Sequence, residues 1–362
     1  MKVLLISSRA DWGGGPEHVY QLVQNLPSQI VPYVACPLDD TPYAALFALK
    51  LGAHRVVHIP HRKFTLGALL HLLSFCRAER IELLHSHGAG GGGYSRLLSR
   101  LLRIPVVHTY HGIHVKSMRP VKKWLRVALE FILGKATTVG IAVSPSEAAL
   151  IKKYNLIDAD RISLIENGVV IPDESVVLSS SAPHRIIHIT RFDPIKNTLF
   201  ISDVLKSLQE LGRNEEFVFE LLGDGEERKR LHAALRLGGF DDQVVFHGFQ
   251  KFPDSFFTGA LCYFSCSLRE GMPLSVLEAQ AAGLPVVVSD VEGNNDLVNH
   301  ETTGLLFSID NADSAARQLC RLADNSLLAS SCAERARANV ETNHSVQKMA
   351  KCVALIYKKA ML

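Results

Sequence analysis

The stretch Ser267–Asp290, with the sequence SLREGMPLSVLEAQAAGLPVVVSD, carries the strongest structural signals in the chain. Pro273 is a residue type favoured at the first position of a helix, because proline lacks the N–H that would have no partner there. The pattern predicts that this helix runs to about Ala282 before Gly283 ends it. Pro285–Ser289 follows as a short apolar run typical of a buried strand. The stretch therefore predicts a helix that leads into a strand of an α/β sheet.

Two glutamates flank the predicted start of this helix. Glu270 lies in the preceding loop, and Glu278 lies about one and a half turns into the helix. The first helical amides, at Leu274 and Ser275, have no partner within the helix and are able to receive a phosphate. Two carboxylates beside an anion site suit a ligand with hydroxyl groups on both sides of a diphosphate. The alternative, from these residues alone, is a pair of ordinary surface glutamates.

On both sides of this stretch, short apolar runs alternate with helical patterns, which predicts parallel sheets covered by helices on both faces. A segment with linker composition, rich in Pro and Ser, interrupts the alternation at residues 171–184. We therefore expect two Rossmann-like domains at 1–170 and 185–345, and a C-terminal helix at 346–362 that packs back on the first domain. Ligands of open α/β sheets bind beyond the carboxyl ends of the strands, so we expect the domains to face each other across a cleft that holds the site. The predicted strands are 3–7, 31–36, 55–59, 82–85, 105–109, 140–143, 161–165, 185–190, 217–222, 244–246, 261–265, 285–289 and 304–307.

Composition excludes several classes of protein. The 362 residues are 47% hydrophobic and 21% charged, which excludes a disordered chain. The net charge of +3 is too balanced for nucleic-acid binding by the whole molecule. The seven cysteines include no CxxC pair, which argues against a disulfide framework or a zinc ribbon and favours a reducing cytoplasm. No apolar run approaches the roughly 18 residues that span a bilayer, so we expect a cytoplasmic protein that is at most peripheral on the inner face of the membrane.

Two glycine runs follow predicted strands. Gly13–Gly15 precedes a helix, where backbone amides can approach an anion; the alternative is an ordinary tight turn. Gly88, Gly90 and Gly93 match GxGxxG, but the acidic residue that a dinucleotide site needs about 20 positions later is absent before Glu130. We therefore expect this second run to form a loop that lines the cleft.

Five histidines crowd one predicted sheet edge: His85, His87, His108, His111 and His114. They could ligate a metal, but no carboxylate or cysteine stands at companion spacing, so we predict no metal site. Neutral hydrogen bonding to hydroxyl-rich ligands fits these residues at least as well. For His85, which ends a strand, a buried and satisfied imidazole is the alternative.

The order of the motifs from Met1 to Phe307 resembles one family. Glu270-x7-Glu278 followed by Ala-x-Ala-x-Gly-x-Pro-Val-Val is similar to the retaining GT-B glycosyltransferases of family 4, of the bacterial cell-surface polysaccharide type. The other matching motifs are Gly13–Gly15, His85-Ser-His87-Gly88, Thr109-Tyr-His111-Gly112, Val143-Ser-Pro-Ser146, Asn167-Gly168-Val169, Arg191 with Lys196, and Gly223-Asp-Gly225. Two positions depart from the family: Val170 replaces an acid, and the usual Gly-Gly-x-x-Glu reads Glu292-Gly-Asn-Asn-Asp296. The second departure leaves the identity of the sugar open.

The resemblance implies a metal-independent, retaining transferase that needs no cofactor. Its donor would be a nucleotide-diphosphate sugar, UDP more than GDP, and its acceptor a hydroxyl of a lipid-linked glycan or another cell-envelope saccharide. Arg191 and Lys196 would clamp the diphosphate, although ordinary surface cations are the alternative. Glu278 would hold the ribose and Glu270 the donor sugar, while His111 would sit beside the reacting centre.

The same resemblance places further residues at the substrates. Gly14 and Gly15 would bring amides to the phosphates or the acceptor, and His87 would contact substrate. Two other functions stay open: a nucleotide-sugar epimerase of the same fold, and a non-catalytic protein that binds sugar nucleotides.

Residues 114–135 combine charge with an apolar helical stripe. They contain six basic residues and one acid, and apolar residues recur at helical spacing. This pattern predicts docking on an anionic membrane surface. The alternative is that the apolar face packs on its own sheet.

Overall fold

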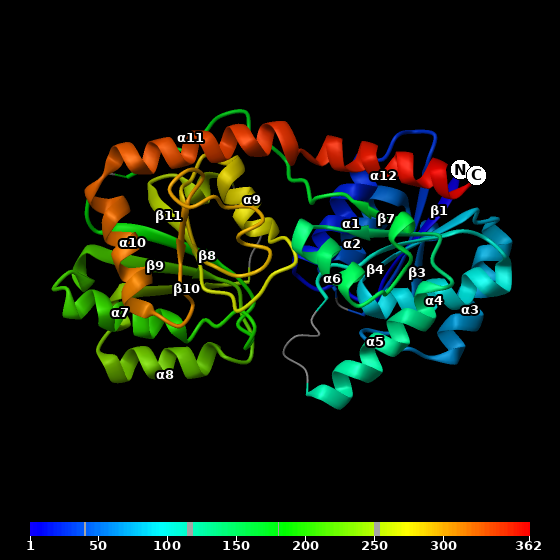
Figure 1. The fold of residues 1–362 in the computed structure, drawn as a ribbon, viewed down its shortest axis with the longest axis horizontal. Coiled ribbons are helices and arrows are strands. Elements are labelled where there is room, and N and C mark those ends of the chain that lie inside the picture. Colours follow the sequence, from blue (N-terminus) through cyan, green and yellow to red (C-terminus); the bar gives the residue numbers. More distant parts are fainter. Residues whose placement is uncertain (40, 114–118, 180, 250–253) are drawn as a thin grey trace. The chain divides into compact units, whose positions relative to one another are not determined.

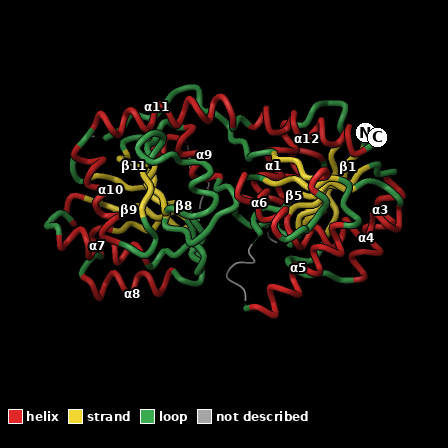
Figure 2. The backbone as a smooth tube through the Cα atoms, viewed as in Figure 1, coloured by secondary structure: helices red, strands yellow, loops and turns green. Residues whose placement is uncertain are grey.

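The computed structural model describes residues 1–39, 41–113, 119–179, 181–249 and 254–362. The chain divides into two compact units (Figure 1). The N-terminal unit comprises Met1–Gly168 and Val346–Leu362, and the C-terminal unit comprises Val169–Ser345. Each unit has strands at its centre and helices around them (Figure 2). The predicted class, α/β with two Rossmann-like domains, is confirmed.

Within the described residues, the N-terminal unit has a seven-stranded parallel sheet in the order β3-β2-β1-β4-β5-β6-β7. Continuous apolar runs form these strands, and in β1 the residues Val3–Ile6 are fully buried. β1 pairs with β4 in the register Val3 to Leu83. The strand order reverses at this pair, which is where open α/β sheets bind ligands. The strands are β1 Lys2–Ser7, β2 Val31–Cys36, β3 Val56–His58, β4 Leu83–His87, β5 Val106–Thr109, β6 Val139–Ala142 and β7 Ile162–Leu164.

Helices cover both faces of this sheet. They are α1 Gly14–Asn25, α2 Pro42–Leu51, α3 Leu66–Glu79, α4 Gly88–Leu102, α5 Pro120–Gly134, α6 Pro145–Lys153 and α12 Val346–Ala360. The C-terminal helix α12 packs against α1, and Met349, Val353 and Tyr357 are buried in the core of the unit. Both ends of the chain therefore belong to the N-terminal unit (Figure 1).

The described part of the C-terminal unit holds a six-stranded parallel sheet in the order β10-β9-β8-β11-β12-β13. Its core is rich in aromatic rings, and Phe264 stacks on Phe307 with ring centroids 5.3 Å apart. The order reverses between β8 and β11, so the loops after these strands are positioned to bind a ligand. The strands are β8 His184–Ile189, β9 Phe217–Leu222, β10 Val244–Gly248, β11 Ala260–Ser265, β12 Val286–Ser289 and β13 Leu305–Phe307; the helices are α7 Phe200–Glu210, α8 Arg228–Gly238, α9 Leu274–Ala281, α10 Ala312–Asp324 and α11 Ser326–Asn343.

The stretch Ser267–Asp290 forms the predicted helix and strand, α9 and β12. Pro273 is the residue before the first helical one, with φ −73° and ψ 118°, so the helix begins one position later than predicted. Gly283 ends the helix in the left-handed region, with φ +77°. The stretch therefore carries its local structure in its own sequence.

The second glycine run is not the predicted loop. Gly88 to Gly93 form the first turns of α4, which runs from Gly88 to Leu102. The reason is close packing on the sheet: a Cβ on Gly91 would lie 2.2 Å from the carbonyl oxygen of Ile6. Glycines here let the helix approach β1 at van der Waals distance. The sequence pattern alone does not distinguish such a closely packed helix start from a flexible loop. Helix α2 was also missing from the predicted elements.

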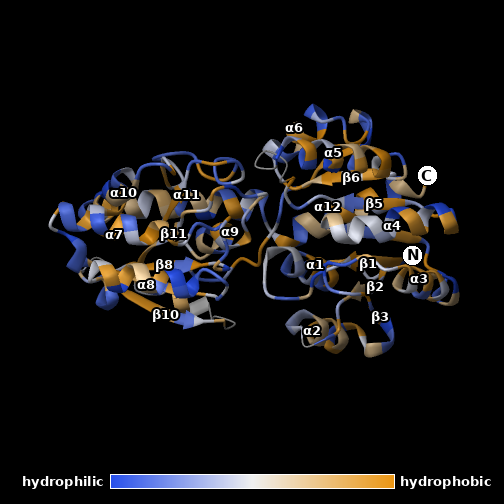
Figure 3. Cartoon of the chain, turned by 90° about the horizontal axis from the view of Figure 1, so that it is seen from below, coloured by the Kyte–Doolittle hydropathy of each residue, from blue (hydrophilic) through white to orange (hydrophobic). Residues whose placement is uncertain are grey.

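Hydropathy follows these layers. Figure 3 shows β1 and β6 of the N-terminal unit in orange, between helices that carry blue patches. None of the helices in the described ranges is long and apolar enough to cross a bilayer.

Candidate functional site

The predicted donor-binding residues lie in the C-terminal unit. Arg191 and Lys196 occupy the loop that follows β8, at the carboxyl edge of the sheet. Asp193 organises this loop: its Oδ1 accepts from the amides of Ile195 at 3.1 Å and Lys196 at 3.2 Å. Its Oδ2 lies 3.0 Å from Nη2 of Arg191. One carboxylate thus sets both the backbone turn and the direction of the arginine.

Lys196 and Glu270 form an ion pair across two loops. Nζ of Lys196 lies 2.6 Å from Oε1 of Glu270, and the two side chains are only 21% and 12% exposed. The amide of Leu268 also donates to the carbonyl of Ile195 at 2.8 Å. The loops after β8 and β11 are therefore fastened together, and the pair keeps a half-buried cation from standing uncompensated.

Tyr263 ties the start of α9 to the end of β8. Its hydroxyl lies 2.8 Å from Oγ of Ser275 and 3.2 Å from the carbonyl oxygen of Ile189. Burial raises the pKa of Tyr263, and the nearby carboxylates of Glu270 and Glu278 act in the same direction. Both glutamates are therefore close enough to act electrostatically on one hydroxyl at the helix start. The structure thus brings together the residues that the sequence placed around a diphosphate site.

The departure at 292–296 lies directly beside Glu270. The amide of Glu270 donates to the carbonyl of Glu292 at 3.0 Å, and a Cβ on Gly293 would lie 2.7 Å from the carbonyl carbon of Glu270. Asn294 then bonds to the carbonyl of Ser289 at 3.0 Å. This loop fixes the Glu270 backbone, so its sequence bears on the sugar that Glu270 would meet.

The loop after β9 packs closely against the start of the loop after β8. Gly223 has φ +124°, and a Cβ there would lie 1.7 Å from the carbonyl oxygen of Thr190. Only glycine fits this position, because any side chain would push away the start of the Arg191 loop.

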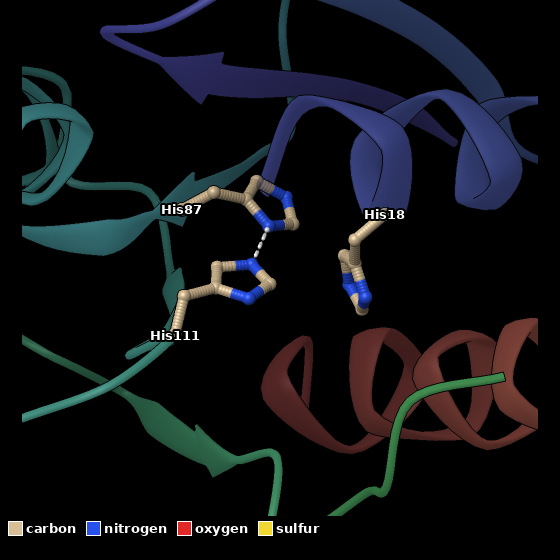
Figure 4. Close-up of side chains that lie close together, drawn as sticks. All are labelled: His18, His87 and His111. Carbon is tan, nitrogen blue, oxygen red and sulfur yellow. Dashed lines mark hydrogen bonds between the residues drawn. The ribbon is translucent and has the colours of Figure 1, made fainter. Parts of the chain in front are cut away.

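A second group lies in the N-terminal unit and contains the predicted His87 and His111 together with His18. His87 ends β4, His111 follows β5, and His18 comes from α1 (Figure 4). Nδ1 of His87 lies 3.1 Å from Nε2 of His111. The ring of His18 meets that of His111 edge-on, with centroids 4.6 Å apart. Nδ1 of His18 in turn bonds to Oδ1 of Asn167 at 3.0 Å.

Burial keeps these imidazoles neutral. Burial lowers the pKa of His18 to about 4, against an ordinary value near 6.5. Burial, assisted by neighbouring histidines, places the pKa values of His87 and His111 well below the ordinary value. A neutral imidazole has one donor and one acceptor nitrogen, so the group can bond to hydroxyls in either sense.

His111 sits on an unusual backbone. Its φ of +58° is rare for a residue with a side chain. Glu147, which is 3% exposed, accepts hydrogen bonds from the amides of Gly112 and Val143, the latter at 2.8 Å. This carboxylate holds the loop that carries His111, and the strain indicates a position selected for its geometry.

The other predicted histidines have structural roles. His85 is fully buried, with Nδ1 2.6 Å from the Tyr357 hydroxyl and Nε2 2.8 Å from Oγ1 of Thr109. His108 bonds to Ser86 at 2.9 Å. His114 lies outside the described residues.

Gly14 and Gly15 open helix α1, one turn before His18. A Cβ on Gly15 would meet nothing within 4 Å, so its backbone faces open space rather than packing. The first amides of a helix have no partner within it and favour an anion.

Sequence reasoning missed His18, Tyr263 and Glu147. His18 and Asn167 are 149 positions apart, and no local pattern joins them. The only available signal for His18 was its place one turn after the glycine run of Gly13–Gly15, on the same helix face as Gly14 and Gly15.

Comparison with known families covers nearly the whole chain. The model described as "Glycosyltransferase Family 4" matches residues 12–171, and the one described as "Glycosyl transferases group 1" matches residues 173–339. The chain belongs to glycosyltransferase family 4. This confirms the resemblance and makes the protein a glycosyltransferase.

Individual relatives of this glycosyltransferase include a protein from Escherichia coli named UDP-Gal:alpha-D-GlcNAc-diphosphoundecaprenol alpha-1,3-galactosyltransferase. It is 29% identical over 279 residues, which cover 72% of this chain and 71% of the relative. The N-acetyl-alpha-D-glucosaminyl L-malate synthase of Bacillus anthracis is 24% identical and covers 77% of this chain and 75% of its own. Among solved structures, HepE from Anabaena in complex with UDP-glucose has a TM-score of 0.83 at 17% identity, over 99% of this chain and 100% of that chain. This likeness supports the GT-B fold.

Proposed function

We propose that this glycosyltransferase moves a sugar from a UDP-sugar to a hydroxyl of a lipid-linked glycan, with retention of configuration at the anomeric carbon. The observation that carries the proposal is the contact of Lys196 with Glu270 beside the start of α9, at the carboxyl edge of the C-terminal sheet. The donor and acceptor in the name of the Escherichia coli relative, and the UDP-glucose in the HepE complex, support the same chemistry.

The C-terminal unit binds the donor in this proposal. Arg191 and Lys196 hold the diphosphate together with the amides of Leu274 and Ser275 at the N-terminus of α9. Glu278 accepts hydrogen bonds from the ribose hydroxyls. Glu270 accepts them from the donor sugar, and its contact with Lys196 keeps both groups oriented before the donor arrives.

The N-terminal unit binds the acceptor. The neutral rings of His87 and His111 offer both donor and acceptor nitrogens to hydroxyl groups. His111 lies beside the reacting centre, and the amides of Gly14 and Gly15 meet a phosphate or the acceptor.

The reaction proceeds on one face of the sugar. The bond from the anomeric carbon to the diphosphate breaks, the acceptor oxygen bonds to the same face, and the acceptor proton passes to the departing phosphate oxygen. The transition state resembles an oxocarbenium ion, and Arg191 and Lys196 stabilise the negative charge that grows on the diphosphate. Because side-chain cations and helix amides supply this stabilisation, the proposed step includes no metal and no cofactor.

The surface of α5 supports docking on an anionic membrane. The face of α5 that carries Glu130 is held by the buried side chain of Arg96 at 2.9 Å. The apolar residues of the helix point outward instead: Val121, Trp124, Leu125, Leu129 and Ile132 are 50% to 72% exposed. The apolar stripe therefore does not pack on its own sheet. Within residues 114–135, those at 114–118 lie outside the described part of the chain. Arg119 and Lys122 are exposed near the stripe, whereas Nζ of Lys123 lies over the ring of Tyr154, 5.2 Å from its centroid.

Exposed apolar side chains continue onto the neighbouring helices of the same unit. Leu66 and Leu70 of α3 and Leu97 and Leu101 of α4 are each at least 40% exposed. An exposed apolar surface with cations nearby suits the boundary between lipid headgroups and acyl chains.

Incubation with a panel of nucleotide sugars, with and without lipid-linked acceptors, tests the proposed reaction. We expect release of UDP and a glycosylated lipid only when a UDP-sugar and an acceptor are both present. Conversion of the donor sugar without any acceptor would indicate an epimerase. Binding without turnover for every combination would indicate a non-catalytic protein.

A further inference from the structure

Three imidazoles of the N-terminal unit converge from three separate segments: His18, His87 and His111 (Figure 4). One nitrogen of each ring lies within 4.8 Å of the corresponding nitrogens of the other two. Nδ1 of His87 and Nε2 of His111 are 3.1 Å apart. Tetrahedral zinc with bonds of about 2.0–2.1 Å holds two ligand nitrogens roughly 3.3 Å apart. Two of the rings therefore already have about the spacing of zinc ligands.

The hydrogen bonds of His18 prepare it as a ligand. Its Nδ1 donates to the side-chain oxygen Oδ1 of Asn167 at 3.0 Å. The lone pair of the ring is therefore on Nε2. Nε2 of His18 and Nε2 of His87 are buried and have no hydrogen-bond partner within the described residues. These two residues are only 3% and 4% exposed. Metal-binding histidines commonly donate their other N–H to a carbonyl or carboxylate oxygen, as His18 does here.

The donor set selects the class of metal. Across the part of the chain that the structure describes, this group contains imidazoles alone, with no carboxylate or thiol. Imidazole nitrogens suit zinc, copper and nickel, whereas magnesium and calcium need oxygen ligands. His111 is less buried than the other two, so we expect an ion to enter on its side.

We infer that His18, His87 and His111 form a site for one zinc ion, with a fourth position open to water or a ligand oxygen. The proton that bridges His87 and His111 moves to the other nitrogen of the same ring, so binding releases no net proton. Zinc there occupies the nitrogens assigned to hydroxyl binding and inhibits transfer; this consequence, unlike the site itself, rests on the proposed function.

Calorimetric titration of the untagged full chain with zinc, in the absence of nucleotide, tests the site. We expect one equivalent to bind, no binding of magnesium, and the visible absorption of tetrahedral cobalt when Co²⁺ replaces zinc. Asn167→Ala removes the oxygen that orients His18 and is expected to weaken zinc binding roughly 10- to 100-fold. His18→Ala removes a ligand and is expected to weaken it by at least as much. Thermal melting of each variant checks that it folds.

Two control variants address other zinc ligands. Cys352→Ser removes the half-buried one of the seven cysteines, and His71→Ala removes an exposed histidine of α3. Both are expected to bind zinc as the wild type does. Absence of binding by the wild type, or equal binding by wild type and folded His18→Ala, would overturn the inference, as would loss of binding in either control.

Transfer assays separate the two proposals. If zinc binds and transfer is absent under all conditions, the site stands and the proposed function fails. If transfer occurs, zinc does not change its rate and calorimetry detects no zinc binding, the function stands and the inference fails. When both hold, inhibition follows the same zinc concentrations as the binding curve.

Discussion

Membrane docking through α5 gives a prediction whose size follows from exposed side chains. Arg119 and Lys122 are exposed at the start of this helix, beside the outward stripe. Each cation near an anionic leaflet contributes on the order of 1 kcal/mol. Replacing both by Ser is therefore expected to cost about 2 kcal/mol, or roughly 30-fold in vesicle binding, at 1.4 kcal/mol per tenfold. Arg126 stays in place, because it lies 3.3 Å from Glu130 and supports the buried pair beneath the helix.

The apolar stripe supplies a second, salt-independent contribution. Trp124 is 70% exposed and Leu125 is 56% exposed, so burying either in lipid contributes about 1–2 kcal/mol. The double replacement by Ser is expected to weaken binding by roughly 30- to 1000-fold at any salt concentration. Only the double cation variant is expected to weaken the dependence on salt.

Co-sedimentation with vesicles of anionic or neutral lipid, at low and high salt, measures both effects. A matched control replaces two exposed cations of α8, Lys229 and Arg236, by Ser, and a second replaces the exposed Leu237. Both controls are expected to bind as the wild type does. Binding that ignores lipid charge, salt and the α5 residues would refute the reasoning, and a soluble dimer formed through the stripe would identify a protein partner instead.

Three further predictions concern the two groups of site residues. Replacing Arg191 and Lys196 together by Ala is expected to lower the transfer rate by roughly two to four orders of magnitude, because the growing phosphate charge loses its cations; unchanged turnover in a steady-state assay would contradict the assignment. Acidification is expected to destabilise the protein, because the pKa of His18 is about 4 in the folded chain and about 6.5 in the unfolded chain. The contribution of this ring to the free energy of unfolding is fully present above pH 6.5, and on the order of 3 kcal/mol is lost as the pH falls towards 4. Urea unfolding as a function of pH measures this, and a flat profile over that interval would show that the rings are not buried as neutral groups. Glu147→Gln removes one of two buried acceptors beneath His111 and is expected to cost about 1–3 kcal/mol in urea unfolding and to slow transfer, whereas an exposed glutamate such as Glu334 is expected to tolerate the same change.

The sequence predicted those parts of the fold that depend on local chemistry. Pro273 and Gly283 bracket α9, and the apolar run after them forms β12, because start, stop and strand signals all act over a few residues. The glycines at the start of α4 were wrongly predicted to form a loop. They are required because the helix packs closely on Ile6, more than 80 positions earlier in the chain. Local patterns do not carry such a distant contact.

The site shows the same division. The family resemblance implied Lys196 and Glu270 as donor residues, but their direct contact joins positions 74 apart and depends on the sheet topology. His18 was missed because its bond to Asn167 exists only once α1 and the segment after β7 lie together in the fold. The helical stripe of α5 was predicted, whereas its outward direction depends on the buried partner of Glu130, Arg96 on α4.

Calorimetry with UDP tests most directly the central claim that the C-terminal group holds the nucleotide diphosphate of the donor. We expect UDP to bind the wild type, to bind Glu278→Ala at least tenfold more weakly because a charged hydrogen bond to ribose contributes about 1.5–3 kcal/mol, and to bind Glu270→Ala nearly as it binds the wild type. The intact UDP-sugar is expected to lose affinity with both variants. Equal losses of free UDP in Glu270→Ala and Glu278→Ala would contradict the separation of ribose and sugar contacts, and no binding of UDP by the wild type would contradict the account itself.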